Sequence, residues 1–162
     1  MQLKKIISLL VLLVLVASCK STSSATKSST SKKSDKLTKQ IIDSAQDNLG
    51  SPYKSGGTTK SGFDCSGLVY STFKNYSISL PRKSIDMSKY GKVIDVKNSE
   101  KGDLIFFKTG GSKQINHVGL IVDLDGNYIK FIHSSTSKGV IISSTKEDYY
   151  KKSFTQVNRV LE

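Results

Sequence analysis

One cysteine and two histidines are the residues of this chain whose types and setting suit nucleophilic catalysis. Cys65 lies in Gly62-Phe63-Asp64-Cys65-Ser66-Gly67-Leu68-Val69, at the predicted start of an apolar helix, and His117 and His133 are the only histidines. Unpaired backbone N–H groups at a helix N-terminus favour a thiolate, and Asp64 is suited to cap that helix. We interpret Cys65, His117 and His133 as nucleophile, base and orienting group.

The mechanism that these residues predict is amide hydrolysis through an acyl-enzyme. His117 takes the thiol proton, and the thiolate attacks an amide carbonyl to give a thioester that water then hydrolyses. His133 fixes the tautomer and ring orientation of His117. The backbone N–H of Cys65 is a natural oxyanion donor, and the hydroxyl of Tyr53 is a second candidate.

Each of these residues also has a structural interpretation. A free cysteine is often a small buried hydrophobe, and a histidine in an apolar strand is often a hydrogen-bonded core residue. One cysteine and two histidines can also bind zinc, but the sequence has no local ligand pair of the Cys-x-x-Cys or His-x-x-x-His kind. We therefore expect neither a metal nor another cofactor.

The elements that must position these residues change in type along the chain. Leu37, Ile41, Ala45 and Leu49 recur every four residues and predict a first amphipathic helix. A second helix is predicted from Cys65 to Asn75, and a short third one over residues 82–90. Short β-branched and aromatic runs then predict about five or six strands, at residues 93–96, 103–107, 118–122, 128–132, 140–142 and 157–161.

Helices followed by strands, without regular alternation, predict an α+β domain with a mainly antiparallel sheet against which the Cys65 helix packs. The turn signal Asp125-Gly126-Asn127 predicts a three-residue hairpin loop. That loop sets His133 opposite Gly119 and diagonal to His117, so the two imidazoles are within reach. Gly119 would leave space for a ring.

The N-terminal residues predict export and lipid anchoring. Lys4 and Lys5 precede the apolar run Ile6 to Val16, which is too short to span a bilayer and resembles a signal peptide. Val16-Ala17-Ser18-Cys19 resembles a lipobox, with an ordinary signal peptide as the alternative. We predict a signal peptide at residues 1–18, a flexible Ser/Thr/Lys tether at 19–36 that begins with lipidated Cys19, and one domain at 37–162.

The chain is strongly basic, with a formal net charge of +12. Such a charge attracts polyanions. An exported lipoprotein rarely meets nucleic acid, so we expect no nucleic-acid partner. Anionic lipid headgroups or carboxylate-rich cell wall are the partners we expect, and a merely solvated basic surface is the alternative.

Four blocks of sequence together resemble the NlpC/p60 family of bacterial cell-wall cysteine peptidases. The order, spacing and local context of these blocks agree over most of residues 40–161. They are Phe63-Asp64-Cys65-Ser66-Gly67-Leu68-Val69, Lys101-Gly102-Asp103-Leu104-Ile105-Phe106-Phe107, Asn116-His117-Val118-Gly119-Leu120-Ile121-Val122 and Phe131-Ile132-His133-Ser134-Ser135.

The resemblance implies a papain-like core and a Cys-His-His triad at Cys65, His117 and His133, with Tyr53 near the nucleophile. It also implies that Asp64, Ser66, Arg82 and Ser84 line a substrate groove. Met87 stands where many relatives have glutamine, which weakens any inference about the substrate group recognised there. Lys101 replaces a frequent proline.

The function that the resemblance implies is hydrolysis of peptidoglycan stem peptides by a lipid-anchored endopeptidase. The bond is either γ-D-glutamyl–diaminopimelate within a stem or the D-alanyl–diaminopimelate crosslink between stems. The alternative is a wall-binding or scaffold lipoprotein of the same fold without turnover. We expect a monomer in the cell envelope, facing the periplasm and held in the outer membrane if the bacterium is Gram-negative.

Overall fold

The computed structural model describes residues 24–161. Its contacts divide the chain into two units, of which the second begins at Lys33 and contains every strand of the described residues. The predicted signal peptide and the lipidation site Cys19 lie outside the described residues. No helix of the part described has the length and apolar character that crossing a membrane requires.

Helix α2, Ser24–Gln46, begins well before the predicted first helix. Residues 24–36 are therefore helical, and the prediction of a flexible tether is wrong for them. The segment contains no glycine or proline, and once the apolar residues farther along nucleate a helix, each added residue gains a hydrogen bond at little cost. Ile41, Ile42 and Ala45 are buried, whereas Leu49 lies in the following turn and is exposed.

Helix α3, Cys65–Lys74, confirms the predicted helix that begins at the cysteine. Leu68, Val69 and Phe73 are buried on its inner side. Helix α4, Ser84–Met87, is shorter than the predicted third helix, because Met87 is the only buried side chain within it. Residues 88–90 form a turn that ends at Gly91, whose φ of 74° suits glycine.

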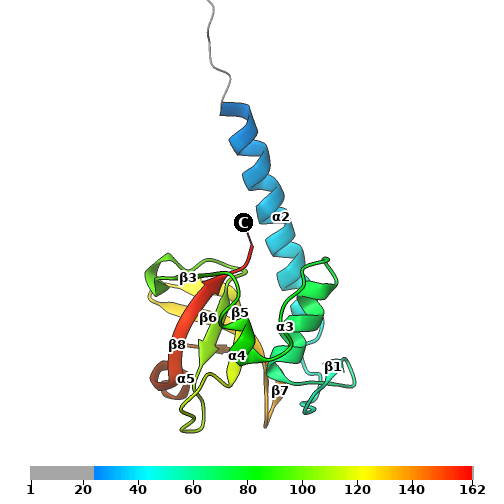
Figure 1. Cartoon of the computed structure of the whole chain (residues 1–162), viewed down its shortest axis with the longest axis vertical. Helices are drawn as coiled ribbons and strands as arrows, with labels where there is room; N and C mark the ends of the chain where they lie inside the picture. Colours follow the sequence, from blue (N-terminus) through cyan, green and yellow to red (C-terminus); the bar gives the residue numbers. More distant parts are fainter. Residues whose placement is uncertain (1–23, 162) are drawn as a thin grey trace, which may run out of the picture. The chain divides into compact units, whose positions relative to one another are not determined.

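Six strands form one antiparallel sheet, which confirms the predicted α+β class (Figure 1). Their spatial order is β3-β8-β4-β5-β6-β7, so β8, the last strand of the chain, lies between β3 and β4. The strands are β3 Lys92–Ile94, β4 Leu104–Phe107, β5 His117–Asp125, β6 Tyr128–Ser135, β7 Gly139–Ser144 and β8 Phe154–Arg159. A 3₁₀ turn, η1 Val96–Asn98, follows β3.

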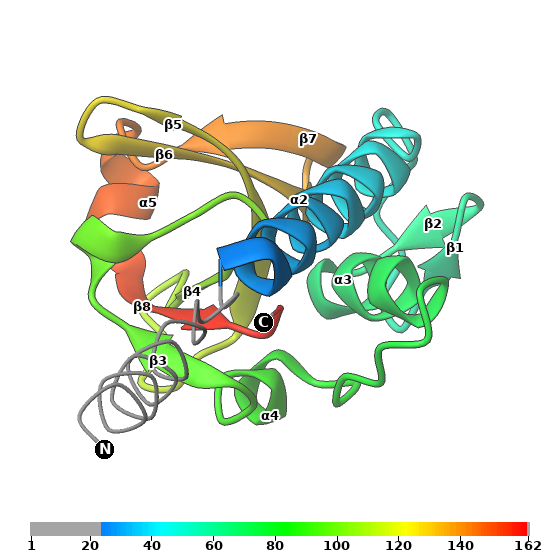
Figure 2. The same cartoon turned by 90° about the horizontal axis from the view of Figure 1, so that it is seen from above.

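The sheet has an apolar core on each face. Alternate residues of β4 divide between the two cores: Leu104 and Phe106 join the cluster that contains α3, and Ile105 and Phe107 join the cluster that contains Tyr150. Tyr150 belongs to helix α5, Asp148–Ser153, which the sequence did not predict. Figures 1 and 2 show α3 and α5 on opposite sides of the sheet.

The β5–β6 hairpin reaches the expected register by a different route. The turn has two residues, because Asp125 pairs with Tyr128, and the prediction of a three-residue loop is wrong. An irregularity between Ile121 and Asp123 shifts the pairing by one residue, so that Leu120 pairs with Ile132. That register sets His133 opposite Gly119 and diagonal to His117, as the sequence analysis predicts.

A two-stranded sheet immediately before the cysteine was also not predicted. Strand β1, Thr58–Thr59, pairs with β2, Gly62–Phe63. Strand β2 leads directly into Asp64 and α3. The buried hydroxyl of Ser134 on β6 donates to the carbonyl of Phe63 at 2.7 Å, which joins this small sheet to the strand that carries His133.

Candidate active site

Asp64 caps the helix that carries the cysteine, as predicted. Its carboxylate accepts a hydrogen bond from the backbone N–H of Gly67 at 2.6 Å and another from that of Gly56 at 2.8 Å. The guanidinium of Arg82 binds both carboxylate oxygens, at 2.9 and 2.6 Å. The bidentate pair fixes the entry of the chain into α3.

The same network includes one more of the residues that the resemblance placed in the substrate groove, Ser66. Arg82 donates to the hydroxyl of Ser66 at 2.9 Å. Partial burial acts to raise the pKa of Asp64, but hydrogen bonds from Arg82, Gly67 and Gly56 lower it overall. The charged forms of Asp64 and Arg82 therefore stabilise each other and the start of α3.

Gly67 lets another backbone approach the helix. A Cβ atom at this position would collide with the carbonyl oxygen of Gly57 and would lie 2.9 Å from a carboxylate oxygen of Asp64. A glycine near the start of the helix therefore permits close approach of another backbone. The approaching backbone belongs to the loop before β1.

The sulfur of Cys65 lies against the backbone on both sides of His117. It is 3.8 Å from the carbonyl oxygen of Asn116, and it also interacts with the backbone N–H of Val118. The side chain is half-buried and unpaired with another cysteine. The structure thus brings Cys65 to the strand end that carries His117.

The two histidines contact each other directly. His117 Nε2 lies 2.9 Å from His133 Nδ1, and the rings meet edge to face with centroids 4.9 Å apart. His117 is buried and His133 has no exposed surface. Gly119 provides the space, because a Cβ there would lie 2.6 Å from the ring of Phe131 and 3.4 Å from Cβ of His133.

Burial sets the protonation states of these groups. It lowers the pKa of His117 to about 4, and burial together with the nearby charge of His117 lowers the pKa of His133 to about 3. Burial also raises the pKa of the Cys65 thiol, although backbone N–H groups of Val118, Ser66 and Cys65 act to lower it. The expected stabilisation of the thiolate by the helix start is thus outweighed by desolvation.

These pKa directions describe a neutral thiol and two neutral imidazoles at neutral pH. A buried imidazole with a low pKa is unprotonated at neutral pH and is available as a base.

Tyr53 lies near the nucleophile, as the resemblance implies. Burial raises the pKa of Tyr53, and the charge that Cys65 carries when ionised and the charge of Asp64 act in the same direction. Tyr53 also forms an isolated bridge with Phe63, just before the cysteine helix.

Ser84 and Met87, the two other positions that the resemblance singled out, differ in how exposed they are. Ser84 is the first residue of α4 and is partly exposed. Met87 is fully buried in the core cluster beneath α3, so its thioether packs against apolar side chains. The substitution of methionine for the usual glutamine is therefore a core feature of this chain.

Tyr150 contacts the histidine pair, although no sequence signal indicates it. Its hydroxyl lies 3.2 Å from His133 Nε2, on the ring nitrogen opposite the one that contacts His117. Nothing in the sequence separates Tyr150 from its neighbour Tyr149, since both lie in a polar segment. Only the packing of α5 on the sheet distinguishes them, with Tyr150 8% exposed and Tyr149 56%.

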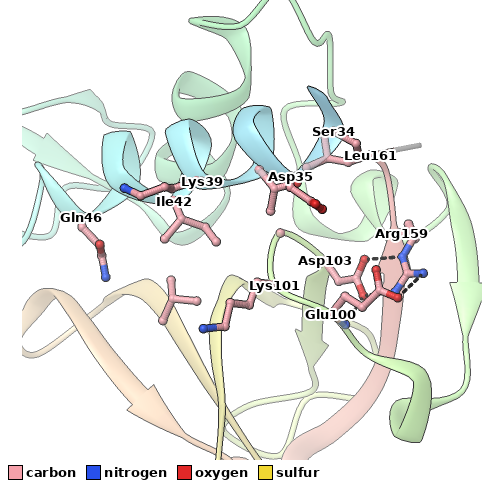
Figure 3. Close-up of a pocket in the computed structure, with 13 residues that line it drawn as sticks. Ser34, Asp35, Lys39, Ile42, Gln46, Glu100, Lys101, Asp103, Arg159 and Leu161 are labelled. Atoms are coloured by element: carbon pink, nitrogen blue, oxygen red, sulfur yellow. Dashed lines mark hydrogen bonds and ion pairs between the residues drawn. The ribbon is translucent and has the colours of Figure 1, made fainter. Parts of the chain in front are cut away.

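A cavity of about 550 Å³ lies elsewhere, between α2, the loop before β4 and the end of β8 (Figure 3). Three charged groups on its wall pair with one another, since Arg159 binds Asp103 at 2.9 Å and Glu100 at 3.2 Å. None of Cys65, His117 and His133 lines this cavity. Within the described residues, no group of three or more His, Cys, Asp or Glu side chains is arranged to hold a metal ion.

The fold and these contacts define a class of protein. A cysteine at the start of a helix, packed on an antiparallel sheet that presents a buried histidine pair, is the arrangement that the resemblance to cysteine peptidases predicts. The chain belongs to the NlpC/P60 family, whose sequence description matches residues 50–159. The family prediction is confirmed.

Named relatives agree with this assignment. The chain is 42% identical over 123 residues to the Escherichia coli murein DD-endopeptidase MepS/murein LD-carboxypeptidase, covering 75% of this chain and 62% of that protein. It is 36% identical over 153 residues to the probable endopeptidase NlpC of Escherichia coli, covering 94% of this chain and 97% of that one. This chain thus spans less than two thirds of the length of the MepS relative.

A solved structure shows the same fold. An NlpC/P60 family protein from Bacillus cereus superposes with a TM-score of 0.71 at 32% identity, over 77% of this chain and 40% of that one. NlpC/P60 is a family of cysteine peptidases, and the two relatives named here are a murein DD-endopeptidase and a probable endopeptidase.

Proposed function

We propose that this protein is a cysteine endopeptidase that hydrolyses amide bonds in peptidoglycan stem peptides. The observation that carries the proposal is the placement of the Cys65 sulfur against the backbone that flanks His117, together with the 2.9 Å contact between His117 and His133. Names of relatives support the substrate class, since one is a murein DD-endopeptidase.

The reaction begins when the Cys65 sulfur attacks the amide carbonyl while His117 takes its proton. The backbone N–H of Cys65 and the Tyr53 hydroxyl are the donors available to the tetrahedral oxyanion. His117 then gives the proton to the departing amine, which leaves a thioester on Cys65. Water, deprotonated by His117, attacks the thioester; the C–S bond breaks, the free acid leaves, and His117 returns the proton to the Cys65 sulfur.

The bond that we favour is the D-alanyl–diaminopimelate crosslink between stems, because the relative named a murein DD-endopeptidase is 42% identical. The γ-D-glutamyl–diaminopimelate bond within a stem is the other bond that the same chemistry could cut. Digestion of purified sacculi separates the two, since crosslink cleavage converts dimeric muropeptides to intact monomers and the other cleavage shortens the stems.

Cys65→Ala is the variant that tests the nucleophile. It should abolish muropeptide release, because alanine has no nucleophilic atom to form the thioester, and it should leave the fold and wall binding intact. The measurement is chromatography of digested sacculi, with circular dichroism and a sacculus pull-down as controls. Hydrolysis undiminished in this variant would refute the assignment, and binding without turnover in the unmodified protein would identify a wall-binding module.

The location that we propose is the cell envelope, with the chain held at a membrane by acylated Cys19. The wall polymer and anionic headgroups there suit a chain of net charge +12. Incorporation of labelled palmitate tests the anchor. Cys19→Ser should lose the label and remain unprocessed, and normal labelling of that variant would contradict the anchor.

A further inference from the structure

The hydroxyl of Tyr150 is the only hydrogen-bond partner that the described residues offer to His133 Nε2, at 3.2 Å. His133 has no exposed surface, and Tyr150 is 8% exposed. Solvent therefore has little access to this contact. The tyrosine hydroxyl therefore determines whether His133 Nε2 donates or accepts the hydrogen bond between them.

The tyrosine ring is held in place by aromatic neighbours. Its centroid lies 5.0 Å from that of Phe131 and 5.3 Å from that of Phe107, both in edge-to-face arrangements. The ring also meets His133 edge to face at 5.3 Å. Such packing fixes the direction in which the hydroxyl points.

The direction of the hydrogen bonds follows from what His117 must do. Its Nε2 is occupied by His133, so Nδ1 is the nitrogen left to take the thiol proton, and Nδ1 must carry a lone pair. A neutral imidazole has one N–H, which then lies on Nε2 and donates to His133 Nδ1. His133 in turn carries its proton on Nε2 and needs an acceptor there.

We propose that Tyr150 is a positioning residue whose oxygen accepts the Nε2–H of His133 and so holds both imidazoles in the tautomers that make His117 a base. The proposal rests on the proposed function. In the opposite direction, Tyr150 donates to His133, His133 Nδ1–H donates to His117, and His117 presents an N–H to the sulfur. That arrangement has no base.

The surroundings of the hydroxyl allow Tyr150 to act as acceptor. The hydroxyl also interacts with Ser143 on β7, and a serine hydroxyl can accept a hydrogen bond as well as donate one. Both residues line a cavity of about 290 Å³ rich in hydroxyl groups, which His117 borders as well. The tyrosine can therefore donate away from His133 while its oxygen accepts from it.

The first experiment measures the tautomer of His133 in the full, unmodified chain by ¹⁵N NMR of labelled imidazoles at neutral pH. We expect the Nε2–H form for both histidines. The Nδ1–H form of His133 would overturn the proposal. This readout does not depend on peptidoglycan hydrolysis, so it separates failure of the proposal from failure of the proposed function.

The second experiment replaces the hydroxyl alone. Tyr150→Phe should lower kcat on muropeptides by about tenfold or more with KM unchanged, because the wrong tautomer removes the base and leaves binding intact. Tyr149→Phe, the matched control on the exposed neighbour, should leave kcat unchanged. A value of kcat in Tyr150→Phe within about twofold of the unmodified protein would contradict the proposal.

Thiol reactivity provides a readout without a peptidoglycan substrate. Alkylation of Cys65 by iodoacetamide at neutral pH, followed on the Cys65 peptide by mass spectrometry, should slow by about fivefold or more in Tyr150→Phe. The rate in Tyr149→Phe should not change. If Tyr150→Phe fails to fold, the tautomer of the unmodified protein decides: Nε2–H on His133 supports the proposal and Nδ1–H overturns it.

Discussion

Asp64 and Arg82 form an ion pair that holds the start of the helix carrying Cys65. Both carboxylate oxygens of Asp64 are bound, by Arg82 and by the backbone N–H groups of Gly67 and Gly56. The resemblance assigned these side chains to the substrate groove. In the structure their contacts hold the start of α3, and so the Cys65 sulfur, in a fixed position.

Arg82→Ala should therefore destabilise the fold and lower activity together. Asp64 would keep its charge in a partly buried place while it lost two charge-assisted hydrogen bonds, at a cost of about 1–3 kcal/mol in the free energy of unfolding. Urea denaturation measures the loss. Lys89→Ala is the control, because Lys89 pairs with Asp86 at 3.9 Å on the surface and should change stability by less than about 0.5 kcal/mol.

At the scale of elements, the site depends on how closely α3 approaches the loop before β1. The Gly57 carbonyl, which accepts the Asp64 N–H at 3.2 Å, occupies the space that a side chain at Gly67 would need. The sheet contributes the other half of the site. His117 begins β5, and the hydrogen bond from Ser134 to Phe63 joins β6 to the segment that leads into the cysteine.

Gly67→Ala should disturb the contact between α3 and the loop before β1. The added methyl group would meet backbone, which yields less readily than a side chain, so we expect a loss of about 1–3 kcal/mol and a fall in kcat/KM. Thermal unfolding and muropeptide release measure the two effects. Ser71→Ala, one turn later in α3, adds no atom and is the control; equal stability of the two variants would show that the close approach is unimportant.

At the scale of the whole molecule, the buried histidine pair couples folding to pH. Both imidazoles are neutral in the folded chain, with pKa values of about 4 for His117 and about 3 for His133. An unfolded chain has histidines that titrate near pH 6.5. Between these values the unfolded state binds more protons, so the stability present above about pH 6.5 is lost as the pH falls toward 4 and 3.

The free energy of unfolding should thus decrease steadily from about pH 6.5 to pH 4. Chemical denaturation at a series of pH values measures it. A His117→Gln/His133→Gln chain lacks the two titrating groups and should show a shallower dependence over that interval. The same slope in both proteins would assign the effect to the carboxylates instead of the histidines.

The sequence by itself determined the α+β class, the start of α3 at Cys65, the cap at Asp64 and the pairing of the histidines. These features depend on local signals: a capping residue before an apolar run, and an alternation of side chains along strands that survives small errors in the turn. The register of His117 and His133 came out as predicted although the loop did not, because the irregularity near Val122 offset the shorter turn.

Only the tertiary structure decided the rest. The burial that raises the pKa of the Cys65 thiol, the bidentate hold of Arg82 on Asp64 and the contact of Tyr150 with His133 join residues far apart in the chain. The two adjacent tyrosines 149 and 150 have the same chemistry in the sequence. Packing of α5 against the sheet buries one of them beside an imidazole and leaves the other in solvent, and no local pattern carries that information.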